Sequence, residues 1–406
     1  MSKFKLDNLN KSEILKIAKR FYFSMGVDDG SSFLCRRNMC YGLSKILWAQ
    51  ENIGMEPNAT FVSSPDESIT RNSTRWNNGI GYGGKLSWGD GRSKIIFLDS
   101  MPNACGMLVG TLDNLPDPKH LIDRIIDIER KSYFVNDVEI EWDFEKGNHF
   151  IDVFSLKKFT ESELPDYAFV IHGGTHEFKG DNPHGMGLYY HQSKILKEMF
   201  KTIETPFGNT KVLFDNDVED YMKLYKIADD FSKKKRLLIA ELIFGDFNVI
   251  TNPNHQALIN YNQHLLGVND IKDPSANGLF PVMLKADLPG YIMKGKNNIN
   301  DEVIEAIGFL KRAEDLGIYH RLSNANILPH GGGYKLKDIS NVVDVIEAKS
   351  KRYFICDMTN DMGLKILSNF KEVEFTYRGK EVMIRTLELG LGEPIAKLIP
   401  NYVLKV

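Results

Sequence analysis

The sequence has few cysteines and no long apolar run. Its four cysteines, at positions 35, 40, 105 and 356, are unevenly spaced, and no two of them form a CxxC pair. Few, scattered cysteines are typical of free thiols in a reducing compartment, so we expect a cytoplasmic protein. A chain of 406 residues can also bury a large core, so it needs neither disulfides nor metals to fold.

Signals for secretion or membrane insertion are also missing. The first 21 residues are polar and then amphipathic, without the apolar segment of a signal peptide. The longest apolar stretches, such as residues 237–243 with Glu241 inside, are far too short to cross a bilayer. We therefore expect neither secretion nor a membrane span.

Neither sign of charge is in large excess. The chain carries 51 lysines and arginines against 54 aspartates and glutamates, for a formal net charge of −3. Proteins that grip long duplex nucleic acid usually present a net basic surface. The balance argues against broad electrostatic binding of nucleic acid, but it permits a local basic groove beside a site.

Hydrophobic periodicity predicts a mixture of helices and strands. Helical spacing predicts helices over residues 11–23, 41–50, 119–130, 192–202, 217–231, 300–316 and 338–348. Short or alternating apolar runs predict strands over residues 94–98, 149–154, 167–172, 236–244 and within 376–406. Residues 56–94 are expected to form loops and short strands, and the basic run 233–236 fits a helix C-terminus.

No repeat or linker divides the chain. We predict the α+β class, with a single large mixed α/β domain over residues 76–406 built on a sheet core. A mostly helical N-terminal extension, residues 1–75, precedes this domain.

Four histidines lie in unusual local contexts, three of them at the end of a predicted strand or beside glycine. His149 begins one apolar strand, and His172 ends another just before Gly173. His255 follows a polar turn, and His330 precedes three consecutive glycines. Strand ends hold ligands rigidly, glycines allow close approach, and neutral imidazole binds many transition metals. Each histidine alone could be a hydrogen-bonded structural residue, but four such contexts favour a metal site.

Cys105 and the glycine run after His330 can be interpreted in more than one way. A thiolate can bridge two cations, and a nearby metal lowers the pKa of the thiol enough to deprotonate it. Free cysteine is also commonly a small buried hydrophobe, so Cys105 alone decides nothing. The run lacks the GxxxxGK[ST] spacing of a P-loop, whereas a glycine turn beside an imidazole is consistent with attack on an α-phosphate.

Several segments, taken in order, resemble the RtcB-type RNA ligases from about residue 79 to the end. The matching segments are residues 79–84 (GIGYGG), 105–107 (CGM), 147–152 (GNHFID), 172–175 (HGGT), 254–256 (NHQ), 278–295 (GLFPVML and LPGYIMKG), 329–333 (PHGGG) and 396–406 (AKLIPNYVLKV). The GNHFID element and the terminus are the most specific of these. The resemblance implies an RtcB-like fold.

The resemblance also implies roles for particular residues. In that family a cysteine and three histidines help to hold two Mn²⁺ ions, which implies that one or two ions bind here at Cys105, His149, His172 and His255. The histidine of the glycine loop becomes guanylylated by GTP, which implies that His330 is the nucleophile. By the same resemblance the nucleotide site would include Asn148 as a phosphate contact, Phe150, and Lys405 as a guanine contact.

The activity implied is the joining of an RNA 3′-phosphate or 2′,3′-cyclic phosphate to a 5′-hydroxyl, with GTP as cosubstrate, as in tRNA splicing or RNA repair, with or without a helper protein. Pro102, Tyr334 and His176 stand where the family has a metal-binding aspartate and two arginines. Two other functions therefore stay open. One is a nucleotidyltransferase that only caps phosphorylated ends. The other is a metal- and RNA-binding relative that does not ligate.

Overall fold

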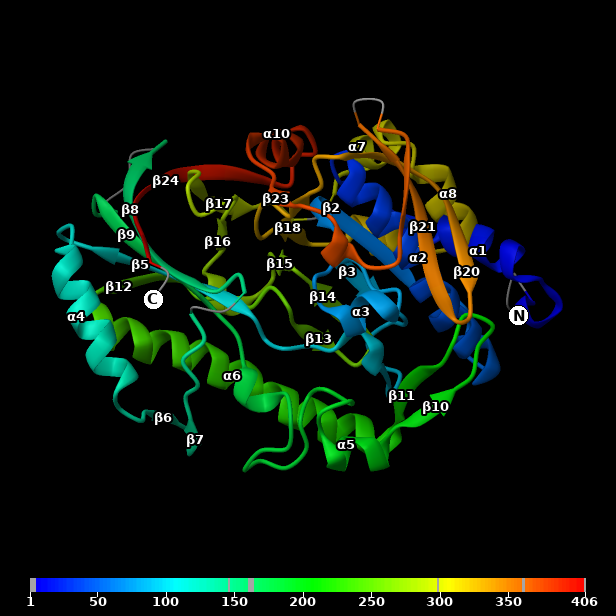
Figure 1. The fold of residues 1–406 in the computed structure, drawn as a ribbon, viewed down its shortest axis with the longest axis horizontal. Helices are drawn as coiled ribbons and strands as arrows, with labels where there is room; N and C mark the ends of the chain where they lie inside the picture. The colour runs from blue at the N-terminus through cyan, green and yellow to red at the C-terminus, as the bar shows by residue number, and fades with distance from the viewer. Residues whose placement is uncertain (1–4, 145–146, 160–163, 298, 360–361, 405–406) are drawn as a thin grey trace.

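A seven-stranded antiparallel sheet supports the region that contains most of the candidate residues (Figure 1). The computed structural model describes residues 5–144, 147–159, 164–297, 299–359 and 362–404. In spatial order the sheet contains β12 (Asn248–Thr251), β5 (Gly106–Leu112), β9 (Tyr167–Gly173), β8 (Phe150–Lys158), β24 (Gly392–Leu404), β17 (Gly290–Gly295) and β16 (Leu279–Val282). The strands predicted at 149–154 and 167–172 are thereby confirmed as parts of β8 and β9.

The two faces of this sheet have different coverings because successive side chains of a strand alternate between faces. Ile151, Val153, Phe169 and Ile171 pack under α6 (Asp215–Phe244) and α4 (Pro118–Glu129). Figure 1 shows α6 running along the sheet as one long helix. The opposite face carries a second apolar layer, which includes Met107, Val109, Phe154 and Val170. By the same alternation, Cys105, just before β5, and His172, near the end of β9, belong to this second face, where the candidate site lies.

A second sheet brings the N-terminal residues into the same core. Its order is β1 (Tyr22–Phe23), β2 (Thr60–Ser68), β3 (Tyr82–Ser87), β14 (Gln263–Leu266) and β13 (Leu258–Asn260). Helix α2 (Gly30–Asn52) packs against β2, and α1 (Lys11–Arg20) packs against α2. One apolar cluster contains buried residues from both sides of the predicted boundary at residue 75. That boundary therefore falls within one sheet and one core.

Smaller elements complete the described structure. The further sheets contain β10 (Lys201–Ile203), β11 (Thr210–Phe214) and β4 (Ile95–Phe97); β15 (Val268–Asp270) and β18 (Ile327–Pro329); β19 (Tyr334–Lys335) and β23 (Thr376–Tyr377); β20 (Ile339–Ala348), β21 (Lys351–Met358) and β22 (Leu364–Leu367); and β6 (Phe134–Val135) with β7 (Val138–Glu139). The further helices are α3 (Ser73–Asn77), α5 (Lys194–Met199), α7 (Asp301–Ala306), α8 (Leu310–Leu316), α9 (Tyr319–Ser323) and α10 (Lys380–Glu388). The fold is thus of the mixed α+β class.

Two predicted elements are wrong. Residues 236–244 are the last turns of α6 and not a strand, because Ile239, Ala240 and Ile243 lie at helical spacing against the large sheet. The basic run 233–236 accordingly lies inside that helix. The segment predicted as a helix at 338–348 forms β20 (Ile339–Ala348), because it pairs antiparallel with β21, for example Val345 with Phe354.

Other predicted elements change in length. The helix expected at 300–316 is divided into α7 and α8 around Gly308, whose φ of +72° is left-handed. The helix expected at 192–202 shortens to α5 and passes into β10, and the one expected at 11–23 ends at Arg20 before β1. Helix α10 interrupts the strands expected within 376–406.

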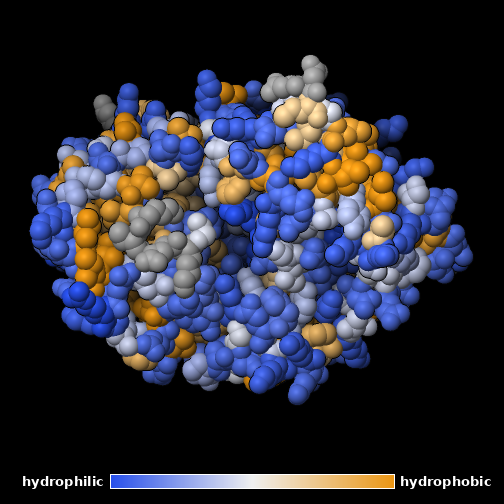
Figure 2. All heavy atoms as spheres, viewed as in Figure 1, coloured by the Kyte–Doolittle hydropathy of each residue, from blue (hydrophilic) through white to orange (hydrophobic). Residues whose placement is uncertain are grey.

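None of the helices in the described ranges is long and apolar enough to cross a membrane. Figure 2 shows a face on which apolar residues gather at the upper right, over β20–β22, and a recess near its centre, bordered mainly by hydrophilic residues.

Candidate active site

Antiparallel pairing brings the predicted metal ligands to one edge of the large sheet. Cys105 immediately precedes β5, His172 is the penultimate residue of β9, and His149 immediately precedes β8. His172 pairs with both Met107 and Phe150, so the start of β5, the end of β9 and the start of β8 coincide. His255 joins them from the loop after β12, where its backbone N–H donates to the Cys105 carbonyl at 2.9 Å.

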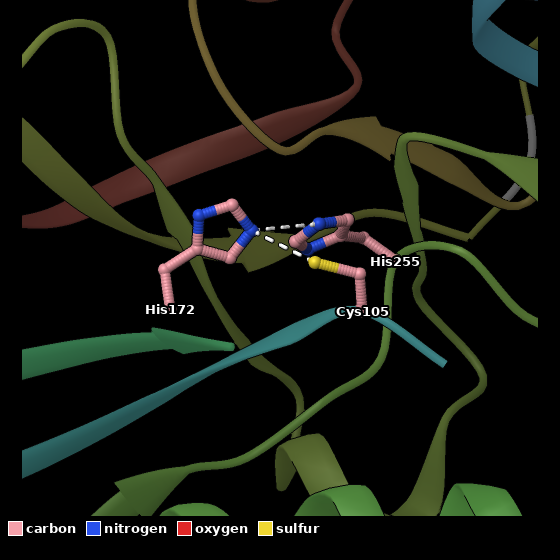
Figure 3. A group of neighbouring side chains, drawn as sticks. All are labelled: Cys105, His172 and His255. Atoms are coloured by element: carbon pink, nitrogen blue, oxygen red, sulfur yellow. Dashed lines mark hydrogen bonds between the residues drawn. The ribbon is translucent and has the colours of Figure 1, made fainter. Parts of the chain in front are cut away.

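Three of the predicted ligands, Cys105, His172 and His255, converge on one point, and His149 approaches this group beside Cys105. Cys105 Sγ lies 3.1 Å from His172 Nε2 and 3.5 Å from His149 Nε2. His172 Nε2 lies 3.3 Å from His255 Nε2, and Figure 3 shows these atoms directed at one another. A tetrahedral ion with ordinary metal–sulfur and metal–nitrogen bonds would separate sulfur from nitrogen by about 3.5 Å and nitrogen from nitrogen by about 3.3 Å. Cys105, His172 and His255 therefore fit a transition-metal ion as three ligands, whereas His149 belongs with Asp143 and His176 to a second group that could hold an ion.

Hydrogen bonds to the Nδ1 atoms of His149 and His172 fix the orientation of these two rings. Asp143 accepts from His149 Nδ1 at 2.8 Å, and the Asn148 carbonyl accepts from His172 Nδ1 at 2.7 Å. Both Nε2 atoms are left facing the cluster as ligands. Asp143 is fully buried, and although burial opposes ionisation, His149 and Lys235 lower the pKa of its carboxyl to about 2. It thus stays a carboxylate at neutral pH.

The protonation of the cluster suits a thiolate ligand. Burial opposes ionisation of the Cys105 thiol, but the imidazoles of His172 and His149 outweigh it and lower the pKa of the thiol well below its usual range. Burial likewise opposes protonation of His149, yet Cys105 and Asp143 raise its pKa to about 9. Burial and the nearby His330 lower the pKa of His255 to about 3.

His330 lies beside this cluster with one nitrogen already engaged. Its ring centroid is 4.4 Å from that of His255. Its Nδ1 lies 2.7 Å from Asp66 Oδ2, and the backbone N–H groups of His330 and Gly331 donate to the same oxygen at 3.1 and 3.2 Å. The proton of a neutral imidazole is therefore held on Nδ1, which leaves the lone pair of Nε2 for attack.

The glycines after His330 are required by packing. A Cβ on Gly332 would lie 2.4 Å from the Arg378 carbonyl oxygen, and a Cβ on Gly333 would lie 2.3 Å from that of Asp66. Gly333 also has a left-handed φ of +64°. These residues let the His330 loop lie directly on the end of β2, where Asp66 is placed.

A largely apolar cavity of about 360 Å³, the His330 pocket, opens beside His330 and His172. Asn148 and Phe150 line it, as do the aromatic residues Tyr334, Phe375 and Tyr377. Asp152 contributes a fully buried carboxylate, whose Oδ1 accepts from the backbone N–H of Leu404 at 3.3 Å. The predicted guanine contact, Lys405, follows Leu404 and lies outside the described residues.

Tyr334 and His176, two of the three residues that depart from the family's pattern, have partners of their own. Tyr334 packs against Phe375 and Tyr377, and His176 lies 3.5 Å from Asp143. Asp99, three residues before Pro102, binds the buried amine of Lys45 at 2.7 Å, and Asn103 Oδ1 accepts from the Cys105 backbone N–H at 3.3 Å. Asp99 and Asn103, the polar residues nearest to Pro102, therefore have other partners and belong to neither group of possible metal ligands among the described residues.

No protein-family model and no curated protein matches the chain.

The arrangement itself limits the chemistry. It combines a thiolate–imidazole cluster, a second imidazole oriented by a carboxylate, and an adjoining cavity with aromatic walls. Sequence patterns identified the donors and His330 but not Asp66, Asp143 or Asp152. Asp66 and Asp143 precede their partners by 264 and 6 residues, at no recognisable motif spacing. Only Asp152, within the GNHFID element, lay in a segment that the sequence had marked.

Proposed function

We propose that the protein is a GTP-dependent RNA ligase of the RtcB type, in which His330 becomes guanylylated and passes GMP to an RNA 3′-phosphate. The observation that carries this proposal is the pairing of His330 Nδ1 with Asp66 at 2.7 Å beside the cluster of Cys105 and three histidines. A structural metal site needs no such oriented imidazole. The in-order resemblance of its motifs to that family supports the same function.

The residues of the chain would perform the first step directly. The Nε2 lone pair of His330 attacks the α-phosphorus of GTP, a nitrogen–phosphorus bond forms, and the bond to the departing pyrophosphate breaks. Asp66 stabilises the positive charge that develops on the ring, as a carboxylate does for a catalytic histidine. Mn²⁺ held by Cys105 and the three histidines would neutralise phosphate charge.

The later steps return His330 to its starting form. An oxygen of the RNA 3′-phosphate attacks the phosphorus of the histidine-bound GMP, and the nitrogen–phosphorus bond breaks. A 5′-hydroxyl then attacks the activated 3′ end, loses its proton and releases GMP. A 2′,3′-cyclic phosphate must first be opened by water to a 3′-phosphate.

The His330 pocket supports guanine as the base. The aromatic side chains of Phe150, Phe375 and Tyr377 offer apolar walls to a flat ring. Asp152 is a carboxylate, which when ionised only accepts hydrogen bonds. Guanine presents two neighbouring donors on its pairing edge, whereas adenine presents an acceptor and one donor, so a carboxylate favours guanine.

The test is intact mass spectrometry after incubation with GTP and Mn²⁺. We expect a GMP adduct on the wild-type protein and on His320→Ala, an exposed histidine away from the cluster, and no adduct on His330→Ala. ATP should give little or no adduct. Failure of the wild-type protein to form an adduct across metals and nucleotides would overturn the proposal.

A second candidate is a nucleotidyltransferase that stops at the capped RNA end. Tyr334 and His176 favour it, because each stands where the ligase family has an arginine and neither supplies a permanent positive charge. Incubation of the enzyme, GTP and a 3′-phosphate RNA with a 5′-hydroxyl RNA separates the two. Accumulation of capped 3′ ends without joined product would establish the capping activity.

A further inference from the structure

A second, polar pocket lies against the metal cluster, next to the His330 pocket. It measures about 230 Å³ and reaches Cys105, His149 and His176. Its walls include the amide side chains of Asn72 and Asn103. The His330 pocket reaches His172 and His330 instead, so the two pockets approach the cluster through different ligands.

Arg71, Tyr82, Asn148 and Tyr334 line both pockets. Ligands bound in the two pockets would therefore meet across these residues, within reach of the cluster. Such an arrangement suits a transfer between two substrates, in which the group donor and the acceptor must touch.

Two cations at the polar pocket have no carboxylate partner. Lys179 follows the short 3-10 turn His176–Phe178, and Arg71 lies in the connection between β2 and β3. Among the residues that the structure describes, no carboxylate oxygen lies within 4.0 Å of either charged group. Lys179 Nζ instead lies 5.8 Å from the Tyr189 ring centroid, and the Arg71 guanidinium lies 4.1 Å from that of Phe375.

A half-buried lysine without an ion pair is unfavourable in the empty protein, because burial removes water from the charge. Burial also lowers the pKa of Lys179. An anion bound in the pocket would supply the missing partner. The guanidinium of Arg71 lies over the Phe375 ring and is hydrogen-bonded to Tyr334, and its remaining N–H groups can bind phosphate oxygens.

We propose that the polar pocket binds the terminal phosphate of the acceptor RNA, with Lys179 and Arg71 as its phosphate-binding residues. This inference rests on the proposed function and adds the place and the recognition of the second substrate. Because Arg71 lines both pockets, a phosphate held there faces the His330 pocket, where the GMP on His330 would lie. Lys179 lines only the polar pocket, so it acts on the acceptor and not on GTP.

The experiment separates charging of His330 from transfer. Wild type, Lys179→Met, Arg71→Met and the control Lys119→Met, an exposed lysine on α4, are charged with GTP and Mn²⁺ and freed of nucleotide. Methionine keeps the apolar stem of each side chain and removes its charge. Each adduct is then chased with pyrophosphate, with a 3′-phosphate RNA oligonucleotide, or with the same RNA ending in a 3′-hydroxyl.

We expect the rate at which Lys179→Met forms the GMP adduct to be within about twofold of the wild-type rate. The rate at which pyrophosphate removes the adduct should also be within about twofold of wild type. Transfer from this variant to the 3′-phosphate RNA at low RNA concentration should fall at least about tenfold, the effect of losing one charge-assisted hydrogen bond of about 1.4 kcal/mol or more. Arg71→Met should show the same loss in transfer. Transfer at the wild-type rate by both variants would overturn the inference.

If the wild-type protein forms no adduct, the proposed function fails, but the inference can still be tested by a binding measurement. Fluorescence anisotropy in Mn²⁺ compares the same oligonucleotide with a 3′-phosphate and a 3′-hydroxyl. We expect wild type and Lys119→Met to prefer the phosphate end and Lys179→Met to lose that preference. Equal affinity of the wild type for both ends would overturn the inference whatever the outcome with GTP.

Discussion

Asp66 Oδ2 accepts three hydrogen bonds from the His330 region: from Nδ1 at 2.7 Å, from the His330 backbone N–H at 3.1 Å and from the Gly331 N–H at 3.2 Å. One carboxylate oxygen therefore fixes both the ring and the loop that carries it. Asp66 lies on β2 and His330 lies in the loop after β18. A residue from the N-terminal part of the chain therefore positions His330.

Replacing Asp66 by asparagine should slow guanylylation of His330 by about 10- to 100-fold, the usual effect of removing the partner that orients a catalytic or ligating histidine. The amide cannot stabilise a positive imidazole as a carboxylate does. The rate of adduct formation is measured by mass spectrometry beside Asp127→Asn, an exposed change on α4. A wild-type rate in Asp66→Asn, or equal losses in both variants, would contradict the positioning role.

Cys105→Ala should remove most of the bound metal, because its thiolate lies 3.1–3.5 Å from two of the histidine nitrogens. The matched control is Cys356→Ala, a buried cysteine in the apolar cluster of β20–β22. Elemental analysis of the purified proteins gives the metal content. Unchanged metal in Cys105→Ala would show that the cluster of Cys105 and histidines is not the metal site.

Metal binding should release about one proton near pH 7.5, and that proton should come from His149. The pKa of His149 in the metal-free protein is about 9, so its ring is largely protonated at that pH, whereas the lowered pKa of Cys105 leaves a thiolate. A metal needs the neutral ring, so affinity should rise about tenfold per pH unit up to about pH 9 and then level off.

Calorimetric titrations in two buffers of different ionisation enthalpy measure this proton release. His149→Gln should bind metal more weakly and release little or no proton. Binding without proton release by the wild type between about pH 7 and 8 would contradict the raised pKa of His149.

Arg236→Met should destabilise both the fold and the metal site. The guanidinium is buried and donates to Asn252 Oδ1 at 2.8 Å, Asn254 Oδ1 at 2.8 Å and the Gly173 carbonyl at 3.2 Å. Burial lowers the pKa of Arg236 only to about 10, so it stays charged at neutral pH. Leaving these acceptors unpaired should lower the free energy of unfolding by roughly 3 kcal/mol or more.

Urea unfolding measures the free energy of unfolding of Arg236→Met and of the control Lys234→Met. Lys234 is an exposed residue on the same helix, α6. Metal content should fall as well, because the segments that Arg236 joins carry His172 and His255. A loss below about 0.5 kcal/mol would mean that water replaces the guanidinium.

Local sequence was sufficient for some elements and misleading for others. The strands β8 and β9 were predictable because each is a short apolar run between polar turns. Residues 236–244 have the same appearance, yet they continue α6. Leu, Ile and Ala satisfy both a buried strand and the apolar side of a helix, and the sheet beneath them decides between the two. Residues 338–348 show the reverse error, since pairing with β21 outweighed an ambiguous pattern.

The sequence by itself indicated the chemical donors of this protein: a cysteine, two histidines at strand ends, a histidine after a polar turn and a histidine before a glycine turn. Such residues are recognisable because the chain places them where regular structure stops. Only the tertiary structure decided that Cys105, His172 and His255 meet, that Asp66 orients His330, and that two pockets of different polarity flank the cluster. These relationships depend on sheet register and on contacts between residues far apart in the chain, which no local pattern encodes.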